Sequence, residues 1–202
     1  MANPATAPKA MSTIGLKNLV IAPLTKDDET GVIYGDLQRM EGIIEATVTN
    51  ENSDPDIQYA DDIEFSVVQL DPQITITTTM TDVPLAIQEM ILDNTMDNNG
   101  VLIKNAGDSS DKYFALGFMS EKSDHTYRYV WFYKVRANPI TQNFATKEGE
   151  DITRQTPEIE WTAVKRTYDG NYQAVADEGQ NGFTAEKAAT FLNSVYEPVP
   201  KG

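Results

Sequence analysis

The sequence predicts a mainly β fold, an antiparallel β-sandwich or barrel with a flanking α-helix. Short segments of alternating apolar and polar residues recur along the 202-residue chain, and clusters of Gly, Pro, Asn and Asp separate them. Strands are expected both before and after the clearest helix, an order that argues against a regular βαβ array. Because the chain shows no internal repeat and no obvious linker, we expect a flexible arm over 1–13, one domain over 14–196 and a tail over 197–202.

The strands expected in the first half are 14–24, 42–50, 62–70 and one that begins at residue 73. The last three begin with the period-two alternation of a strand that has one buried face. Residues 50–62 lie between the second and third of them, and Pro55 stands there among acidic and amide side chains. This composition predicts a loop.

The polar faces of three of these strands carry hydroxyl and carboxylate groups but no basic group. They comprise Glu45, Thr47, Thr49, Asp62, Glu64, Ser66, Thr75, Thr77 and Thr79. On the strand that begins at 73, Ile74 and Ile76 occupy the opposite face. The solvent face of any sandwich has this character, so the pattern alone does not assign a function to these residues.

The clearest helix follows that strand. Asp82 is expected as its N-cap, with Pro84 in the first turn, where the missing N–H costs nothing. Apolar residues then recur at helical spacing: Leu85, Ile87, Met90 and Ile91. The polar stretch 93–100 ends the helix.

The second half of the chain returns to strands. Segments 112–120 and 126–137 flank a turn at 121–125 and predict a long hairpin. Residues 156–168 are expected to form a further strand, and Asp169-Gly170 a hairpin-type turn. A second helix is expected over 184–196, capped by Thr184.

The charge of the chain is strongly negative and unevenly distributed. The net charge is −15, and residues 1–100 hold only four basic groups against seventeen acidic ones. Between Arg39 and Lys104 there is no basic residue at all. Such a stretch cannot neutralise phosphates, which argues against sequence-independent nucleic-acid binding through it.

The residues needed for most catalytic and metal sites are missing from the sequence. There is no cysteine and a single histidine, His125, which lies in a predicted turn. Residues 95–100 resemble part of a calcium loop, but Thr95 stands at the first ligand position and Ala106 at the twelfth. The acidic stretch 51–64 lacks ligand spacing, and acids are too numerous to single out a pair for glycoside hydrolysis. We therefore expect no enzyme, no cofactor and no metal site.

The aromatic strand 127–135 alternates Tyr127, Tyr129, Trp131 and Tyr133 with other residues. A platform for sugars or nucleotides has this composition. So does a strand that faces its own core on one side and a neighbouring subunit on the other. We favour the interface, because this strand carries Arg128 and Lys134 in an otherwise acidic chain.

Four stretches together resemble a known family. They are YADDIEFSVVQLDPQITITTTMTDVPLAIQEMIL at 59–92, KYFALGF at 112–118, YRYVWFYKVRANP at 127–139 and TKEGEDITRQTPEIEW at 146–161. In order and spacing they resemble the major tail protein family of phages with long non-contractile tails that infect Gram-positive bacteria. The resemblance is best over 14–168, and the turn SDHTY departs from it by lacking a glycine.

The resemblance implies a structural tail tube protein of the virion, assembled in the host cytoplasm, with a fold shared by secretion-system tube proteins. Six subunits would form a ring, and stacked rings a conduit for double-stranded DNA that is not bound specifically. The other expected partners are the tape measure, tail terminator and distal tail proteins. Alternatives are a tail-terminator or secretion-tube ring protein and, in a different class, a carbohydrate-binding β-sandwich.

The site residues expected on this basis form three groups. The nine polar-face residues named above are expected to line the lumen. Contacts between subunits are expected from Asp54, Asp56, Asp61, Asp62, Arg128, Trp131, Lys134, Arg136, Lys165 and Arg166. Residues 1–13, 50–62 and 197–202 are expected to link one ring to the next.

Overall fold

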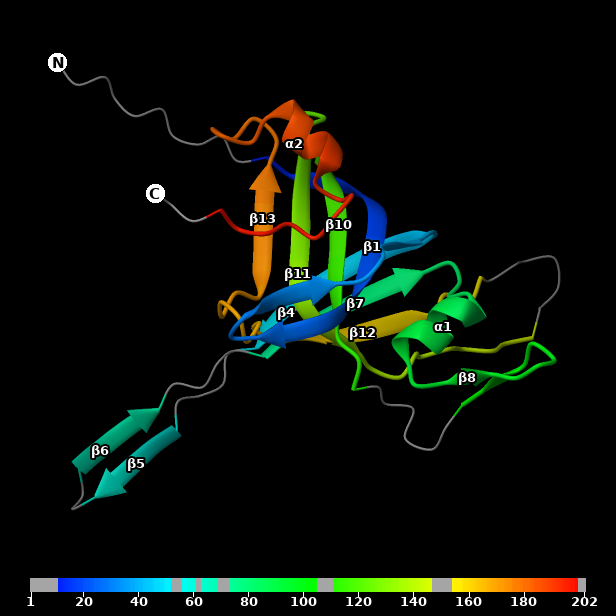
Figure 1. The fold of residues 1–202 in the computed structure, drawn as a ribbon, viewed down its shortest axis with the longest axis horizontal. Coiled ribbons are helices and arrows are strands. Elements are labelled where there is room, and N and C mark those ends of the chain that lie inside the picture. The colour runs from blue at the N-terminus through cyan, green and yellow to red at the C-terminus, as the bar shows by residue number, and fades with distance from the viewer. Residues whose placement is uncertain are drawn as a thin grey trace.

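The fold is mainly antiparallel β with small helices, as the sequence predicts (Figure 1). A computed structural model of the chain describes residues 11–51, 56–60, 63–68, 73–104, 111–146 and 154–199. All strand pairs within this described part are antiparallel.

A single large sheet organises the domain. Its strands follow the order β2-β1-β10-β11-β12-β7-β4, with β13 added on β11 and β3 on β1. Their bounds are β1 Thr13–Asp28, β2 Gly31–Tyr34, β3 Gln38–Met40, β4 Ile43–Glu51, β7 Gln73–Met80, β10 Phe114–Lys122, β11 Tyr127–Ala137, β12 Glu158–Ala163 and β13 Gln173–Asp177. The short strands β2 and β3 are not predicted by the sequence.

The sheet folds over on itself at β11. Residues 128–132 of this strand pair with β13, whereas residues 135–137 pair with β12. As a result the β4–β7–β12 layer packs against the β1–β10–β11 layer, and Trp161 and Ile76 share one apolar cluster with Leu116. The predicted sandwich is confirmed.

The helices close the remaining faces of this core. The helix α1 spans Leu85–Ile91, with Ile91 fully buried. Its N-cap is Pro84 and makes no side-chain cap bond, so the predicted Asp82 cap is wrong. The helix α2 spans Ala185–Thr190 and ends sooner than predicted, but its cap is confirmed, since the Lys187 N–H donates to Thr184 Oγ1.

The far face of β10 and β11 is covered by α2 and the segment after it. Tyr129 and Trp131 pack there with Ala188 and Phe191 in a second apolar cluster. The Trp131 indole N–H donates to the backbone oxygen of Phe191 at 2.9 Å. The aromatic strand therefore has both faces covered by its own chain over these residues.

Strands β5 (Asp56–Ala60) and β6 (Ile63–Val68) form a separate two-stranded sheet. Figure 1 shows this hairpin standing away from the large sheet. The predicted loop over 50–62 is therefore wrong for residues 56–60, which are strand. The strands β8 (Thr95–Met96) and β9 (Leu102–Ile103) form a third, very small sheet near α1.

Candidate functional site

The outer side of the β4–β7–β12 layer carries polar residues in three cross-strand rows. Residues directly opposite each other on neighbouring strands point to the same side of a sheet. The rows are Glu45–Thr79–Glu158–Thr141, Thr47–Thr77–Glu160–Asn138 and Thr49–Thr75–Thr162–Arg136. We call these twelve residues the polar face.

The polar face is set by the alternation of its strands. On β7, Ile74, Ile76, Thr78 and Met80 are buried, whereas the three intervening threonines are partly exposed. On β12, Ile159 and Trp161 are buried between exposed acids. The same strands thus contribute core residues to one side and hydroxyl or carboxylate groups to the other.

The polar face combines three carboxylates with a single cation among its described residues. Glu45, Glu158 and Glu160 are exposed, and Glu160 Oε1 accepts a 2.6 Å hydrogen bond from the Asn138 amide. Arg136 is half-buried at the end of the third row. The face can therefore bind water and counter-cations, but it offers a polyanion little attraction.

Six of the nine residues predicted to line a lumen lie together on this face: Glu45, Thr47, Thr49, Thr75, Thr77 and Thr79. Glu64 and Ser66 lie on β6, which pairs with β5 and not with β4 or β7. Asp62 lies outside the described residues. These two residues thus lie on a different sheet from the other six, and the neighbour of β7 opposite β4 is β12.

The contribution of β12 is missed by sequence reasoning, although its signal is present. Residues 158–163 read EIEWTA, in which Glu158, Glu160 and Thr162 alternate with apolar residues. Sequence alone does not say which strands become neighbours, because the partner of β7 follows it by more than seventy residues.

The β4–β7–β12 layer ends laterally in two different edges. One is β4, which pairs with β7 and with no other described strand. The other is the segment 138–144 beside β12, where Thr141 pairs with Glu158 and the Asn138 N–H donates to the Glu160 oxygen at 2.8 Å. A polar sheet face thus lies between two edges of different composition.

Two of the residues predicted to contact another subunit are buried inside the protomer. Trp131 and Arg166 are fully buried, which corrects the prediction that they lie at a subunit surface. Arg166 is held by Asp169 and Glu197, and its guanidinium lies 4.0 Å from the centroid of the Tyr133 ring. The charge of Arg166 is therefore paired within its own chain.

Arg128 and Lys134 are also paired within the protomer. Arg128 Nε and Nη2 contact Asp177 at 2.7 and 2.8 Å, and Lys134 Nζ contacts Asp27 at 2.6 Å. Asp56 lies on β5, and Lys165 follows β12 at an exposed position. Asp54, Asp61 and Asp62 lie outside the described residues.

The ionised form of the Asp27 carboxylate is stabilised by its surroundings. Burial opposes its ionisation, but Lys134 and the backbone N–H groups of Thr167 and Tyr168 outweigh burial and lower the pKa of Asp27 to about 2. The ion pair fixes β1 to β11 and to the segment after β12. Its role is structural.

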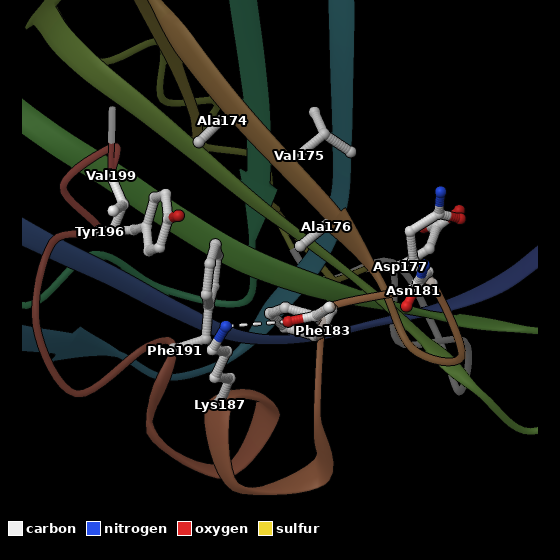
Figure 2. A pocket seen from close by; sticks show the side chains of 12 residues that line it. Ala174, Val175, Ala176, Asp177, Asn181, Phe183, Lys187, Phe191, Tyr196 and Val199 are labelled. Carbon is white, nitrogen blue, oxygen red and sulfur yellow. Dashed lines mark hydrogen bonds between the residues drawn. The ribbon is translucent and has the colours of Figure 1, made fainter. Parts of the chain in front are cut away.

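A separate groove of about 710 Å³ lies between β13, α2 and the C-terminal segment. Figure 2 shows Phe183, Phe191 and Tyr196 along its wall, with Lys187 at the side of α2. The Lys187 ammonium donates to the Gly182 oxygen at 2.8 Å. Aromatic and aliphatic residues line part of the groove, and Asp177, Gln180, Asn181 and Lys187 line the rest. These residues include no nucleophile with an adjacent base.

Three further observations concern metal ligands, the histidine and membrane spans in the described part of the chain. No group of three or more His, Asp or Glu side chains could hold a metal ion there. His125 contacts Glu121 at 3.1 Å in an exposed turn. Of the described helices, none has the length and apolar character needed to cross a lipid bilayer.

Comparison with known proteins gives a family and likenesses among solved structures. A family model described as phage tail tube protein matches residues 10–197. No curated protein matches the chain. Among solved structures, the chain is similar to a component of the anti-feeding prophage baseplate determined by cryo-EM with six-fold symmetrisation. That likeness has 8% identity and a TM-score of 0.39, and it covers 87% of this chain and 97% of the other.

The family match extends over nearly the whole described domain, including every strand of the polar face. The resemblance found in the sequence is thereby confirmed at the level of the family, whose members are structural and not enzymatic. The chain belongs to the phage tail tube protein family.

Proposed function

We propose that this protein is the major tail tube subunit of a siphophage, forming rings of six that stack into a conduit for double-stranded DNA. Family membership supports the tail tube role, and the polar face carries the proposal for the lumen. In this arrangement the three rows of the polar face line the channel.

The chemistry of the polar face suits a channel that must not retain its cargo. Duplex DNA binds proteins mainly through cations placed against its phosphates. Threonine hydroxyls keep the wall wet, and Glu45, Glu158 and Glu160 repel phosphate. The single Arg136 at the end of one row leaves the excess negative.

The lateral contacts within a ring are head to tail, so two different surfaces must match. The strongly acidic first half of the chain and the nearly neutral second half favour an ionic contact between such surfaces. Three candidate cations, Arg128, Lys134 and Arg166, are neutralised by acids of their own chain. We therefore expect these three cations to add little to the salt dependence of assembly.

Contacts between rings are assigned to the β5–β6 hairpin and to the terminal segments 1–13 and 197–202. A two-stranded hairpin on its own is only marginally stable in water. Its separation from the large sheet supports a role in which it packs on another subunit. Glu197 contacts Arg166 in the protomer, and residues 1–10 and 200–202 lie outside the described ones.

Negative-stain microscopy of the concentrated purified protein tests the tube, and cryo-EM of the tubes tests the lumen. We expect long hollow tubes with Thr77 on the inner wall. Isolated rings would favour a terminator-type protein, and monomers at all concentrations would contradict the proposal. A channel lined by lysine or arginine side chains would contradict the assignment of the polar face.

A further inference from the structure

We propose that Phe144 of one protomer inserts into a partly apolar groove beside β4 of the next protomer and so joins neighbours within a ring. This inference rests on the proposed tube function and specifies its lateral contact. Four observations carry it: the groove, the exposed ring, the side of the sheet that they share and the charges beside them.

The groove lies where the sandwich is open, along the free edge of β4. Ile44, Ala46 and Val48 line one side, and Phe118 and Val130 line the other. Polar residues complete the lining, among them Thr13, Asn50, Ser120 and Gln173. Its volume is about 670 Å³. Ile44 is 50% exposed and Val48 40% exposed, although both lie on an otherwise well-packed sheet. Apolar groups left open along a strand edge are typical of a contact surface.

Phe144 stands at the opposite lateral edge of the same layer. Its side chain is 89% exposed, the highest exposure of any large hydrophobic residue in the described part of the chain. The segment that carries it is held to β12 by the pairing of Thr141 with Glu158. An aromatic ring so exposed, on a segment anchored to the sheet, has the character of an interface anchor.

The groove and Phe144 lie on the same side of the sheet. Ile140 is buried in the main apolar cluster. Gln142 and Phe144 line one hollow with Val83 and Gln88, which are buried at the start of α1, so Phe144 lies on the core side. On β4, Ala46 and Val48 are opposite the buried Thr78 and Ile76.

When sheets are placed edge to edge in a ring, each β4 meets the 138–144 segment of its neighbour. The shared side then brings Phe144 over the groove, while the polar faces join into one continuous surface. An isologous dimer would instead bring β4 against β4, which leaves both Phe144 side chains exposed.

The charges beside the two features are complementary. Lys104 lies beside Phe144 in the hollow formed with α1. Glu45 lies at the margin of the polar face, next to the register shift of β4, and also lines the groove. No ion pair to either side chain occurs within the described part of the protomer. Asp82 also lines the hollow beside Phe144. Arg128 also lines the groove, but it already forms an ion pair with Asp177 of the same protomer. Lys104 of one copy can therefore pair with Glu45 of the next.

The absence of cysteine from the chain allows a direct crosslinking test. We expect assembled F144C/V48C protein, treated with a short bismaleimide, to give a ladder of covalent oligomers that ends at the size of one ring. F144C alone and the matched pair F144C/I33C, with Ile33 exposed on distant β2, should give none. Tubes without the F144C/V48C ladder, or a ladder that continues past one ring, would overturn the proposal.

Substitution tests the energetics. F144A should raise the concentration needed for assembly about tenfold, since it removes a buried aromatic contact from each interface. I33A should not change it. K104E and E45K should each weaken assembly, and the double variant should restore it. Circular dichroism verifies that each variant is folded.

The outcomes separate this inference from the proposed function. Wild-type tubes together with normal assembly of F144A would reject the Phe144 contact and leave the tube intact. Tubes that never form from wild-type protein would reject the proposed function itself.

Discussion

The Trp161 indole N–H on β12 donates a hydrogen bond of 3.0 Å to Thr78 Oγ1 on β7, inside the core beneath the polar face. Thr78 Oγ1 in turn donates to the Ile159 oxygen at 3.2 Å. Both Thr78 and Trp161 are fully buried. This pair therefore fixes the register of the two strands that carry half of the polar face.

Replacing Thr78 with Val should destabilise the protomer by about 1–3 kcal/mol, because it keeps the shape but leaves the Trp161 N–H unpaired in the core. Urea denaturation measures the free energy of unfolding. T77V, one residue along and on the polar face, is the matched control and should stay within about 0.5 kcal/mol of wild type. Equal stability of the two variants would contradict the role of the hydrogen bond.

Gly117 on β10 is expected to tolerate no larger residue. It lies opposite Trp131 on β11, and a Cβ atom added there would come 2.7 Å from the indole ring. G117A should cost about 1–3 kcal/mol through overpacking. At Gly15 the nearest atom would be at an ordinary 3.5 Å, so G15A is the control. Thermal unfolding of both variants compares the two sites, and an unchanged melting temperature in G117A would refute the close approach.

D27N should lower stability by about 2 kcal/mol at pH 7. The pKa of Asp27 falls from 3.8 to about 2 in the folded protein, where Lys134 and two backbone N–H groups outweigh burial. A depressed pKa means that the stabilisation is complete above pH 3.8 and is lost as the pH falls through 2. Wild type and D27N should therefore converge in denaturation experiments at the acid end of this range.

The control for that series is D36N, which alters an exposed carboxylate near β2. It should stay within about 0.5 kcal/mol of wild type at pH 7. A constant difference between D27N and wild type down to pH 2 would show that packing, and not the charge of Asp27, stabilises this site.

Replacing residues 52–72 with Asn-Gly should leave the protomer folded but unable to form long tubes. Glu51 and Gln73 are directly opposite on β4 and β7, so a two-residue turn can join them without a change of register. Circular dichroism measures folding and negative-stain microscopy measures assembly. Tubes of normal length would reject the hairpin as a contact between rings.

Local alternation predicts the elements of the polar face well. Thr75, Thr77 and Thr79 alternate with buried residues, and the matching pattern on β4 has the same period, so both faces follow from the sequence. The identity of the strand beside β7 does not follow from the sequence. Its partner β12 is more than seventy residues away, and no local pattern encodes which distant strands pair.

Burial of the aromatic strand fails to be predicted for the same reason. Trp131 looks available for another subunit because its cover, Phe191, is sixty residues further along the chain. The hairpin β5–β6 is missed for a local reason. Pro55 and the acidic residues around it dominate the loop signal, although Ile57 and Tyr59 alternate with polar residues on β5.

The two unlike edges of the β4–β7–β12 layer have a consequence for mixed populations of subunits. In the proposed ring every junction is needed, and each protomer would supply one β4 edge and one 138–144 edge. A subunit damaged at Phe144 but intact at β4 would still dock on an intact neighbour and would then prevent closure. Such a variant would inhibit assembly dominantly when mixed with wild-type protein. The steepness with which tube formation falls as the fraction of variant rises would report the number of subunits in the ring.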